Sequence, residues 1–494
     1  MNRTTGLLGV AFAAASLVAA RPASACGGCF VPPTENTVVT GHRMAMSISP
    51  VQSVLWDQIQ YSGAPEEFSW VLPVKPGAKV ELANDAWFEA LDAATNSVVQ
   101  GPLSSCNSFG SFDNGPLFGC GAQAEAAFPT SDRSGGDVPP PVTIVHEGTV
   151  GPYETVTLSA EDPNALQKWL DDHGYKLPDD VKPTVTAYVK EGFDFIAMRL
   201  IPGVDVNAMR PVRVITPGAV LGLPLRMVAA GTGAETAIKL FVIGEGRYQT
   251  KNFANVLIDR DKLLWDFDTN SSNFSSVRQS TLAQNDGKSF LTSYARDASL
   301  LDESFDDVGP VSYTIQTPDF SYSRTASSIA AAYYFQGDAN GEKVGNVNEC
   351  VTRASLAGSA NQKVVDTCDA DGNCSAAGSD EVAASDLVCG ELDDLAVALN
   401  GLHTRDVWVT RLEANLPRAA LGSDLMLEAA DAQEVVAHRL VVAKSVNDPC
   451  GPSGAAMVAP TRRGPNLPGG LVGLGLGLAS LAWLARRRTQ PARA

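Results

Sequence analysis

The sequence predicts an α+β fold with largely antiparallel sheets, a few packed helices, disulfide-stapled loops and one C-terminal apolar helix. Three observations predict it. Between residues 142 and 243 two strand patterns precede two helix patterns and then further strands, so helices and strands do not alternate as they do around a parallel sheet. Nine cysteines indicate disulfides. The uncharged run 471–485 indicates a helix near the C-terminus.

The first elements follow from periodicity and from cap residues. Alternating apolar residues predict a strand at 43–48, and a β-rich run that proline stops predicts another at 68–74. Asn84-Asp85 then caps a helix. The apolar face of this helix consists of Trp87, Phe88 and Leu91. Residues 100–141 are rich in Gly, Ser and Asn and end in three prolines, which predicts a loop.

Strands dominate the rest of the body. They are expected at 142–145, 153–158, 193–200, 212–215, 223–228, 237–243, 407–412 and 435–442. Helices are expected from Ser159 or Asp162 to Gly174, from about Asp180 to Gly192, and at 391–399. Residues 250–310 are polar and less periodic. The run of strands after the two helices favours an antiparallel sheet.

The composition is that of a globular protein. Of 494 residues, 45% are hydrophobic and 19% are charged, so the chain can bury a sizeable core. The formal net charge is −18. We therefore expect no nucleic-acid partner, because Lys and Arg are needed to neutralise phosphate.

The N-terminus has the pattern of an export signal. Arg3 is followed by an apolar run without charge, and Ala23-Ser24-Ala25 provides the small residues that signal peptidase requires. The run is too short to span the membrane. The expected organisation is a signal peptide at 1–25, a body at 26–140 and 141–450, a linker at 451–470 and a transmembrane or sorting helix with its basic cluster at 471–488.

The C-terminus has the pattern of an anchor. Residues 471–485 carry no charge, and Arg486-Arg487-Arg488 follows them. A helix of this length measures about 22 Å, which flanking arginines and glycines can extend towards the bilayer thickness. The basic cluster would stay in the cytoplasm, so the acidic body would lie outside. The pattern resembles the tripartite sorting signals of exported bacterial proteins, the PEP-CTERM-like class, which implies that the helix is often removed.

Cysteine spacing indicates local disulfides. We expect Cys106 to pair with Cys120 and Cys368 with Cys374, with Cys350 and Cys389 closing a larger loop. The three others are Cys26, Cys29 and Cys450.

Cys26 and Cys29 form a C-x-x-C motif immediately after the expected cleavage site. Two prolines follow and exclude the helix on which a redox centre would rest, so a structural disulfide is favoured over redox or metal chemistry. Lipidation of Cys26 is the alternative, although Ala23 occupies the position where such sites carry leucine.

One loop resembles the start of a calcium site. Asp369, Asp371 and Asn373 have the spacing of calcium ligands, with Asp380 at the twelfth position. Cys374 occupies the sixth position, where the turn of such a loop requires glycine. A disulfide-closed surface loop is the favoured interpretation, and calcium binding is the alternative.

Several segments resemble an exported bacterial family known as domain of unknown function 2330. They are 25–30, 68–74, 150–153, 162–175, 224–233 and 410–428. The resemblance extends over most of residues 25–445 and implies secretion or surface anchoring. It implies no activity and no functional residues.

No catalytic or cofactor motif is present in the sequence. The five histidines form no H-E-x-x-H pattern, and there is no G-x-S-x-G elbow or Walker loop. Adjacent acids at 171–172, 179–180 and 393–394 have the chemistry of glycosidase carboxylates, but such pairs usually solvate helix ends. We expect no cofactor.

These observations favour a non-catalytic, surface-anchored envelope protein with an interaction or structural role. The expected partners are an envelope or surface protein and the membrane itself, contacted through the C-terminal helix. The alternatives are a secreted carboxylate-based hydrolase and a calcium-dependent adhesion module.

Overall fold

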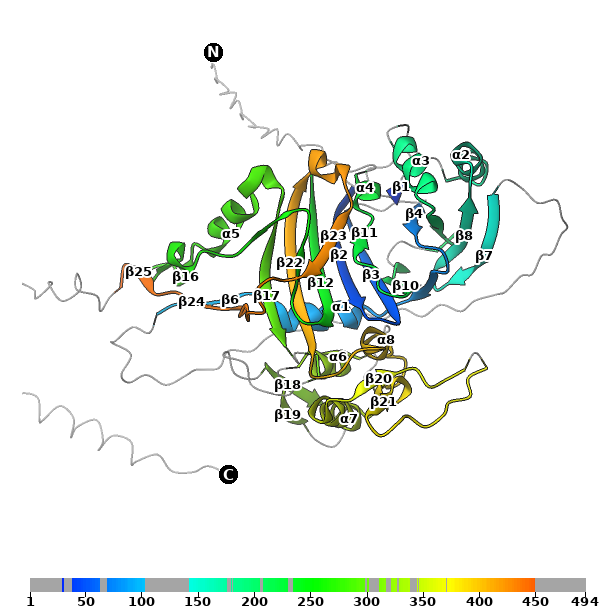
Figure 1. Cartoon of the computed structure of the whole chain (residues 1–494). Coiled ribbons are helices and arrows are strands. Elements are labelled where there is room, and N and C mark those ends of the chain that lie inside the picture. The colour runs from blue at the N-terminus through cyan, green and yellow to red at the C-terminus, as the bar shows by residue number, and fades with distance from the viewer. Residues whose placement is uncertain are drawn as a thin grey trace, which may run out of the picture. The chain divides into compact units, whose positions relative to one another are not determined.

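A computed structural model shows how these elements assemble (Figure 1). It describes residues 29–30, 38–62, 69–102, 142–175, 179, 181–204, 208–229, 234–297, 300–301, 311–316, 321–326, 328–337, 344, 346–369 and 371–448. In this part of the chain every helix is too short or too polar to cross a membrane. The expected signal peptide, the linker and the C-terminal apolar helix lie outside the described residues.

An eight-stranded sheet, here called the large sheet, forms the centre of the fold (Figure 1). Its strands, in spatial order, are β14 (Ala254–Val256), β17 (Ser289–Asp297), β22 (Val407–Pro417), β12 (Glu235–Glu245), β2 (Val38–Ile48), β3 (Gln52–Ser62), β10 (Val212–Pro217) and β5 (Lys79–Leu82). Five of the seven neighbouring pairs are antiparallel; β14 with β17 and β12 with β2 are parallel.

A five-stranded antiparallel sheet, here called the small sheet, packs against part of the large one. Its order is β1 (Cys29–Phe30), β4 (Ser69–Val74), β9 (Asp194–Leu200), β8 (Tyr153–Ala160) and β7 (Val142–Val150). Residues that alternate along β4 and β9, such as Leu72 and Ile196, bury one face against β3 and β10 of the large sheet. The opposite face is covered by α2 (Pro163–Asp172) and α3 (Lys182–Lys190).

The other strands of the described residues form five small sheets of two or three strands each. They are β11 (Gly222–Leu223), β23 (Leu425–Ala429) and β13 (Tyr248–Thr250); β16 (Ser271–Ser272), β15 (Leu264–Asp266) and β25 (Lys444–Val446); β18 (Val311–Gln316) and β19 (Ser321–Ala326); β20 (Lys363–Val365) and β21 (Glu381–Ala383); and β24 (Arg439–Val441) and β6 (Val98–Gln100).

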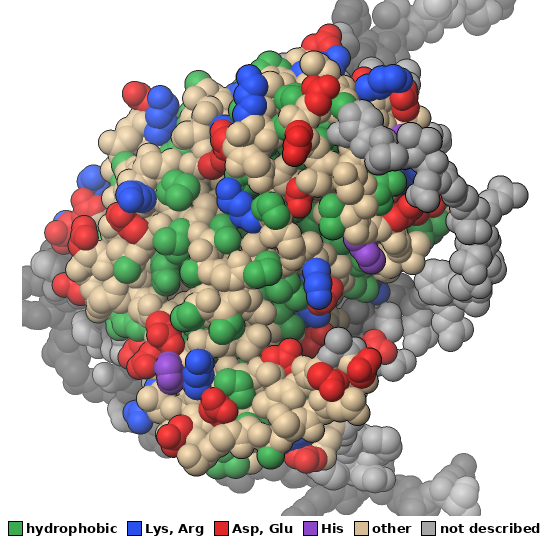
Figure 2. Space-filling model, turned by 45° about the vertical axis from the view of Figure 1, so that its right-hand side comes forward, with side chains coloured by type: hydrophobic (Ala, Val, Ile, Leu, Met, Phe, Trp, Pro, Cys, Tyr) green, Lys and Arg blue, Asp and Glu red, His purple; other side chains and the backbone are tan. Residues whose placement is uncertain are grey.

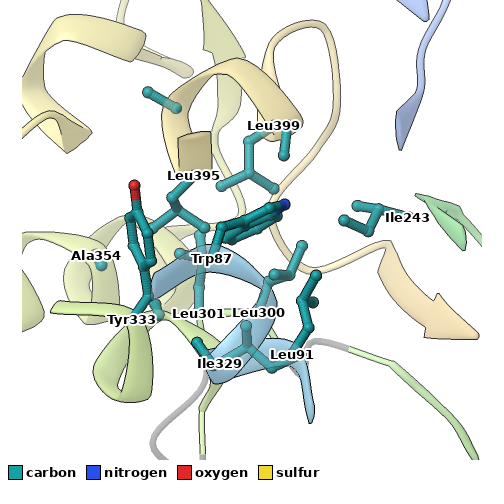
Figure 3. Packing of buried hydrophobic residues seen from close by; sticks show 14 of the residues in the cluster. Trp87, Leu91, Ile243, Leu300, Leu301, Ile329, Tyr333, Ala354, Leu395 and Leu399 are labelled. Carbon is teal, nitrogen blue, oxygen red and sulfur yellow. The ribbon is translucent and has the colours of Figure 1, made fainter. Parts of the chain in front are cut away.

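Helices cover the other face of the large sheet. The remaining helices are α1 (Asp85–Thr95), α5 (Phe274–Leu282), α6 (Ile329–Gln336), α7 (Val347–Ala360) and α8 (Asp394–Leu399), together with α4 (Leu225–Val228), which packs instead beside Met44 and Met46 on the face towards the small sheet. Trp87 of α1 is fully buried in one cluster with Tyr333 of α6, Leu395 of α8 and Ile243 of the sheet (Figure 3). Its ring meets that of Tyr333 edge-on, with 5.3 Å between centroids. The predicted apolar helix face therefore organises the largest core.

The α+β prediction is confirmed, and most predicted elements are present. The strand expected at 43–48 belongs to β2, and α1 begins directly after Asn84. The Asp162 carboxylate accepts a hydrogen bond from the backbone N–H of Asn164 at 3.0 Å and so caps α2. Positive φ angles at Gly174 (+88°) and Gly192 (+73°) follow α2 and α3, as the sequence predicts.

The structure corrects several boundaries. The strand expected at 223–228 stops at Leu223 and is followed by the helical turn α4, because the distant Asp424 carboxylate accepts the backbone N–H of Arg226 at 3.0 Å. The strand expected at 142–145 continues to Val150, since backbone pairing with β8 requires no apolar side chain. Of the strand expected at 435–442, only Arg439–Val441 forms β24.

One long strand in the polar region 250–310 was missed. This strand is β17, which lies inside the large sheet between β14 and β22. Its buried positions include the polar residues Ser289, Thr292 and Ser293. The sequence therefore lacks the continuous apolar run that would predict a buried strand.

Buried ion pairs join α1 to the centre of the large sheet. Asp92 of α1 accepts hydrogen bonds from Arg43 on β2 and Lys239 on β12, each at 2.7 Å. Burial raises the pKa of the Asp92 carboxyl, but the hydrogen bonds from Lys239 and Arg43 outweigh it, so the pKa lies below its ordinary value. The pKa of buried Glu413 is likewise lowered, because Arg411 and Arg278 outweigh burial.

We expect the protein to lose stability as the pH falls below about 4, the ordinary carboxyl pKa, and through the lower pKa values of the folded chain. Both pKa values are lower in the folded chain, so the unfolded chain binds more protons there and acid favours unfolding. Urea unfolding at pH 5 and pH 3 measures the loss, and Asp92→Asn is expected to reduce it. A urea midpoint that is equal at the two pH values would contradict this expectation.

Candidate functional site

A cavity of about 430 Å³ lies between the two sheets. Ligand sites in proteins commonly enclose about 300–1,000 Å³. Most of its lining side chains are apolar; they come from β2, β3, β4, β10 and the segment before α4, and include Met46, Leu55, Leu72, Val74, Val214, Val220, Leu221 and Leu223. We call it the inter-sheet cavity.

Strand register explains why these side chains converge. Val214 of β10 pairs with Leu55 of β3, and Leu55 pairs with Met46 of β2, so all three lie on the face of the large sheet that looks towards the small sheet. Leu221 and Met426 also line the cavity while 37% and 42% of their surfaces remain exposed. The cavity is therefore apolar inside and reaches the protein surface.

Charged side chains also line this cavity. The Lys75 ammonium lies 3.6 Å from the centroid of the Phe193 ring, a cation–π contact between two lining residues. Arg226 binds both oxygens of Glu191, at 2.8 and 2.6 Å, and also contacts Asp424 at 2.8 Å. The Tyr188 hydroxyl donates to the Asp424 carboxylate.

These contacts shift the pKa values of two groups, Glu191 and Tyr188. The hydrogen bonds from Arg226 hold the pKa of Glu191 below its ordinary value. Burial and the neighbouring Asp424 raise the pKa of the Tyr188 hydroxyl. The hydroxyl therefore stays protonated and donates a hydrogen bond to the Asp424 carboxylate. Glu191 is therefore a poor general acid, and the cavity is suited to binding an apolar molecule with charged groups at its edge.

Sequence reasoning missed every residue of this cavity as a site. It also missed a buried pair on neighbouring strands, His42 of β2 and Asp57 of β3, whose Nδ1 and Oδ2 atoms are 3.2 Å apart. The alternation of strand residues predicted that some of these side chains would be buried. No spacing signal indicated that they would face one another across two sheets.

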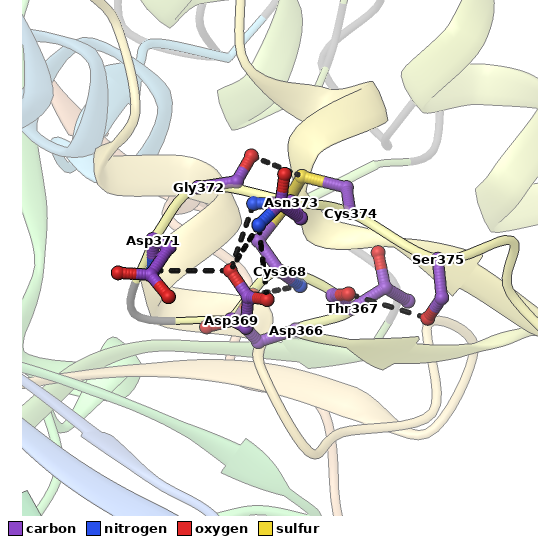
Figure 4. Close-up of a disulfide and its surroundings, with 9 residues drawn as sticks. All are labelled: Asp366, Thr367, Cys368, Asp369, Asp371, Gly372, Asn373, Cys374 and Ser375. Carbon is purple, nitrogen blue, oxygen red and sulfur yellow. Dashed lines mark hydrogen bonds between the residues drawn. A yellow bond between two sulfur atoms is a disulfide. The ribbon is translucent and has the colours of Figure 1, made fainter.

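The predicted calcium ligands lie in an exposed loop closed by the Cys368–Cys374 disulfide (Figure 4). The Asp369 carboxylate accepts backbone N–H groups from Asp371 at 3.0 Å and from Asn373 at 2.8 Å. These hydrogen bonds, chiefly from Asn373, lower the pKa of Asp369. The carboxylate of Asp369, the first predicted calcium ligand, is thus already hydrogen-bonded to backbone N–H groups of its own loop. Calcium binding stays a prediction.

Disulfides join two of the predicted cysteine pairs, Cys368 with Cys374 and Cys350 with Cys389. Cys26, Cys106, Cys120 and Cys450 lie outside the described residues, and the backbone of Cys29 pairs with Trp70 in the small sheet. Within the ranges that the structure describes, no three His, Cys, Asp or Glu side chains are grouped to hold a metal ion.

Both residues of the acidic pair 393–394 form ion pairs with the buried Arg213. Asp393 binds the Arg213 guanidinium through both oxygens, at 2.7 and 2.6 Å, and Asp394 binds it at 2.9 Å. Of the other pairs, Asp172 binds Lys168 and Asp179 binds Lys182, both on the surface, while residue 180 lies outside the described ranges. Acidic and basic side chains are interspersed among hydrophobic ones across the visible face (Figure 2).

The fold and the cavity define an α+β protein in which two packed sheets enclose a ligand-sized apolar space. The chain belongs to the family described as an uncharacterized protein conserved in bacteria (DUF2330), which matches residues 20–306, more than half of the sequence. This match includes the whole small sheet and most of the residues that line the cavity; Asp424 and Met426 lie beyond it. No curated protein and no solved structure matches the chain.

Proposed function

We propose that the protein is an exported, surface-anchored envelope protein that binds an apolar ligand in the inter-sheet cavity without transforming it. The cavity is the observation that carries this proposal. Its volume of about 430 Å³ and its aliphatic walls suit the apolar part of a small ligand. Burial of that part would supply the affinity, at roughly 25 cal/mol per Å² before the costs of association.

The charges at the cavity support binding over carboxylate-based hydrolysis. A glycosidase requires one carboxyl that keeps its proton and a second that is ionised. Glu191 and Asp424 both bind Arg226, and the pKa of Glu191 is lowered. Burial raises the pKa of the Asp394 carboxyl, but Asp394 is fully enclosed and does not line the cavity.

The envelope location rests on the two ends of the sequence, with support from the cysteines. Residues 1–25 have the pattern of an export signal, and residues 471–488 have that of an anchor or sorting signal. The Cys350–Cys389 and Cys368–Cys374 disulfides suit an oxidising compartment. Cell fractionation tests the location: recovery of the intact chain in the cytosol with reduced thiols would refute it.

Replacing Ala219 by Trp is expected to weaken ligand binding at least about tenfold. Ala219 is exposed and lines the cavity, so an indole there would occupy space that a ligand needs while the buried core stays unchanged. The measurement is a fluorescence titration of the intact protein with anilinonaphthalene sulfonate, a probe that brightens in apolar surroundings.

Ala283→Trp is the matched control. Ala283 is also exposed but lies at the C-terminal end of α5, away from the residues that line the cavity. This variant is expected to bind the probe like the wild type. Equal weakening in both variants, or no binding by the wild type, would refute the ligand-binding proposal.

A further inference from the structure

His42 and Asp57 form a polar pair inside the apolar contact between the two sheets. Their side chains project from neighbouring strands, β2 and β3, and the residues are only 3% and 6% exposed. His42 Nδ1 lies 3.3 and 3.2 Å from the two carboxylate oxygens of Asp57. Among the described residues, His42 Nε2 is buried and has no hydrogen-bond partner.

This arrangement fixes what the free nitrogen can bind. An ionised carboxylate only accepts hydrogen bonds, so Nδ1 must carry the proton that it shares with Asp57. In the neutral imidazole Nε2 is then an acceptor. A buried acceptor without a donor is costly, and native structures rarely leave one unsatisfied. For this neutral form of His42 the missing partner is a hydrogen-bond donor.

His42 lines a second, much smaller space of about 20 Å³, here called the His42 chamber. The chamber and the inter-sheet cavity share four lining residues, Leu55, Leu72, Leu223 and Pro224, so they are neighbours. A space of this size holds one water-sized group. His42 and Asp57 both line this chamber, so its polar group has two possible partners. A hydroxyl carried by a ligand chain would add to this hydrogen bonding the burial of the chain in the neighbouring cavity, which a water cannot do.

We infer that the His42 chamber holds the terminal hydroxyl of an aliphatic ligand whose chain occupies the inter-sheet cavity. The inference rests on the proposed function and names its ligand class. The hydroxyl donates to His42 Nε2, and Asp57 orients the ring through Nδ1. The aliphatic lining accommodates the chain. His42 is thus the residue that recognises the hydroxyl, and Asp57 is the residue that positions His42.

Two isomeric probes test this assignment on the intact protein. 1-Octanol carries a terminal donor, and 1-methoxyheptane has the same atoms but no donor. Each displaces anilinonaphthalene sulfonate in competition titrations. We expect the wild type to bind 1-octanol about tenfold more tightly, the effect of one hydrogen bond to a buried acceptor. We also expect 1-octanol alone to shift the ¹⁵N resonance of His42 Nε2.

The variant His42→Leu/Asp57→Leu removes both polar partners together, so neither is left buried alone. It is expected to bind the two probes equally, at the wild-type level for the ether. A wild type that binds both probes with equal affinity would refute the His42 assignment and leave the ligand cavity standing. A wild type that binds neither probe and no dye would refute the proposed function itself. If the double variant does not fold, the wild-type comparison and the NMR shift still decide.

Discussion

Asp394→Ala is expected to lower the free energy of unfolding by about 3–5 kcal/mol, the cost of removing one partner from a buried ionic cluster. Asp394 is 0% exposed. Its carboxylate accepts hydrogen bonds from Trp56 Nε1 at 2.8 Å, the backbone N–H of Asn84 at 2.9 Å and Arg213 at 2.9 Å. Alanine would leave all three donors buried without this acceptor, and each unpaired donor is costly.

The position of Asp394 in the fold explains the size of this effect. It is the first residue of α8, while Trp56 and Arg213 belong to β3 and β10, and Asn84 directly precedes α1. One carboxylate thus joins two helix starts to the large sheet. Urea unfolding followed by circular dichroism measures the loss.

Asp393→Ala is the matched control. Asp393 is the neighbouring residue and binds the same Arg213, but 38% of its side chain is exposed. Exposed ion pairs contribute about 0–1 kcal/mol. We therefore expect a loss several times smaller than for Asp394→Ala. Equal losses in the two variants would show that burial of the Asp394 cluster does not matter for stability.

Removing the Cys350–Cys389 disulfide with paired alanines is expected to lower the free energy of unfolding by about 4 kcal/mol. The bond joins residues 39 apart in sequence, so it restricts a long stretch of the unfolded chain. Both cysteines are also buried in the core around Trp87. The measurement is urea unfolding of the oxidised protein, wild type against variant.

The Cys368–Cys374 pair provides the comparison. Its residues are only six apart and lie on an exposed loop, so the same chain-entropy argument gives about 2 kcal/mol. The two double-alanine variants therefore separate loop length from the mere presence of a disulfide. A larger loss from the short pair would contradict the argument.

The sequence predicted those parts of the fold that depend on near neighbours along the chain. The apolar face of α1, the Asp162 cap of α2 and the glycines that follow α2 and α3 were all visible, because each depends on residues within a few positions. The Cys368–Cys374 pair was predicted for a similar reason, since its cysteines are six residues apart, whereas Cys350 and Cys389, 39 residues apart, were paired because they flank that loop. The helical turn α4 was mistaken for a strand because the carboxylate that accepts one of its backbone N–H groups belongs to Asp424, 198 residues away from Arg226.

The candidate site could not be predicted in this way. The inter-sheet cavity is lined by residues from Met46 to Met426, and most of them alone are ordinary apolar strand or loop residues. His42 and Asp57 had no motif spacing, since they face one another only because β2 and β3 pair in one particular register. A shift of one residue would place every side chain of a strand on the opposite face of the sheet.

By itself the sequence determined the α+β class, the helices α1, α2, α3 and α8, the two disulfides and the family, while α5, α6 and α7 were not predicted. The tertiary structure alone decided which strands are neighbours, where the cavity lies and which polar groups share a buried site. The reason is physical: helix periodicity and caps depend on contacts within a few residues, whereas Trp56 and Asp394, 338 residues apart, form a hydrogen bond only after the whole sheet and its helices have packed.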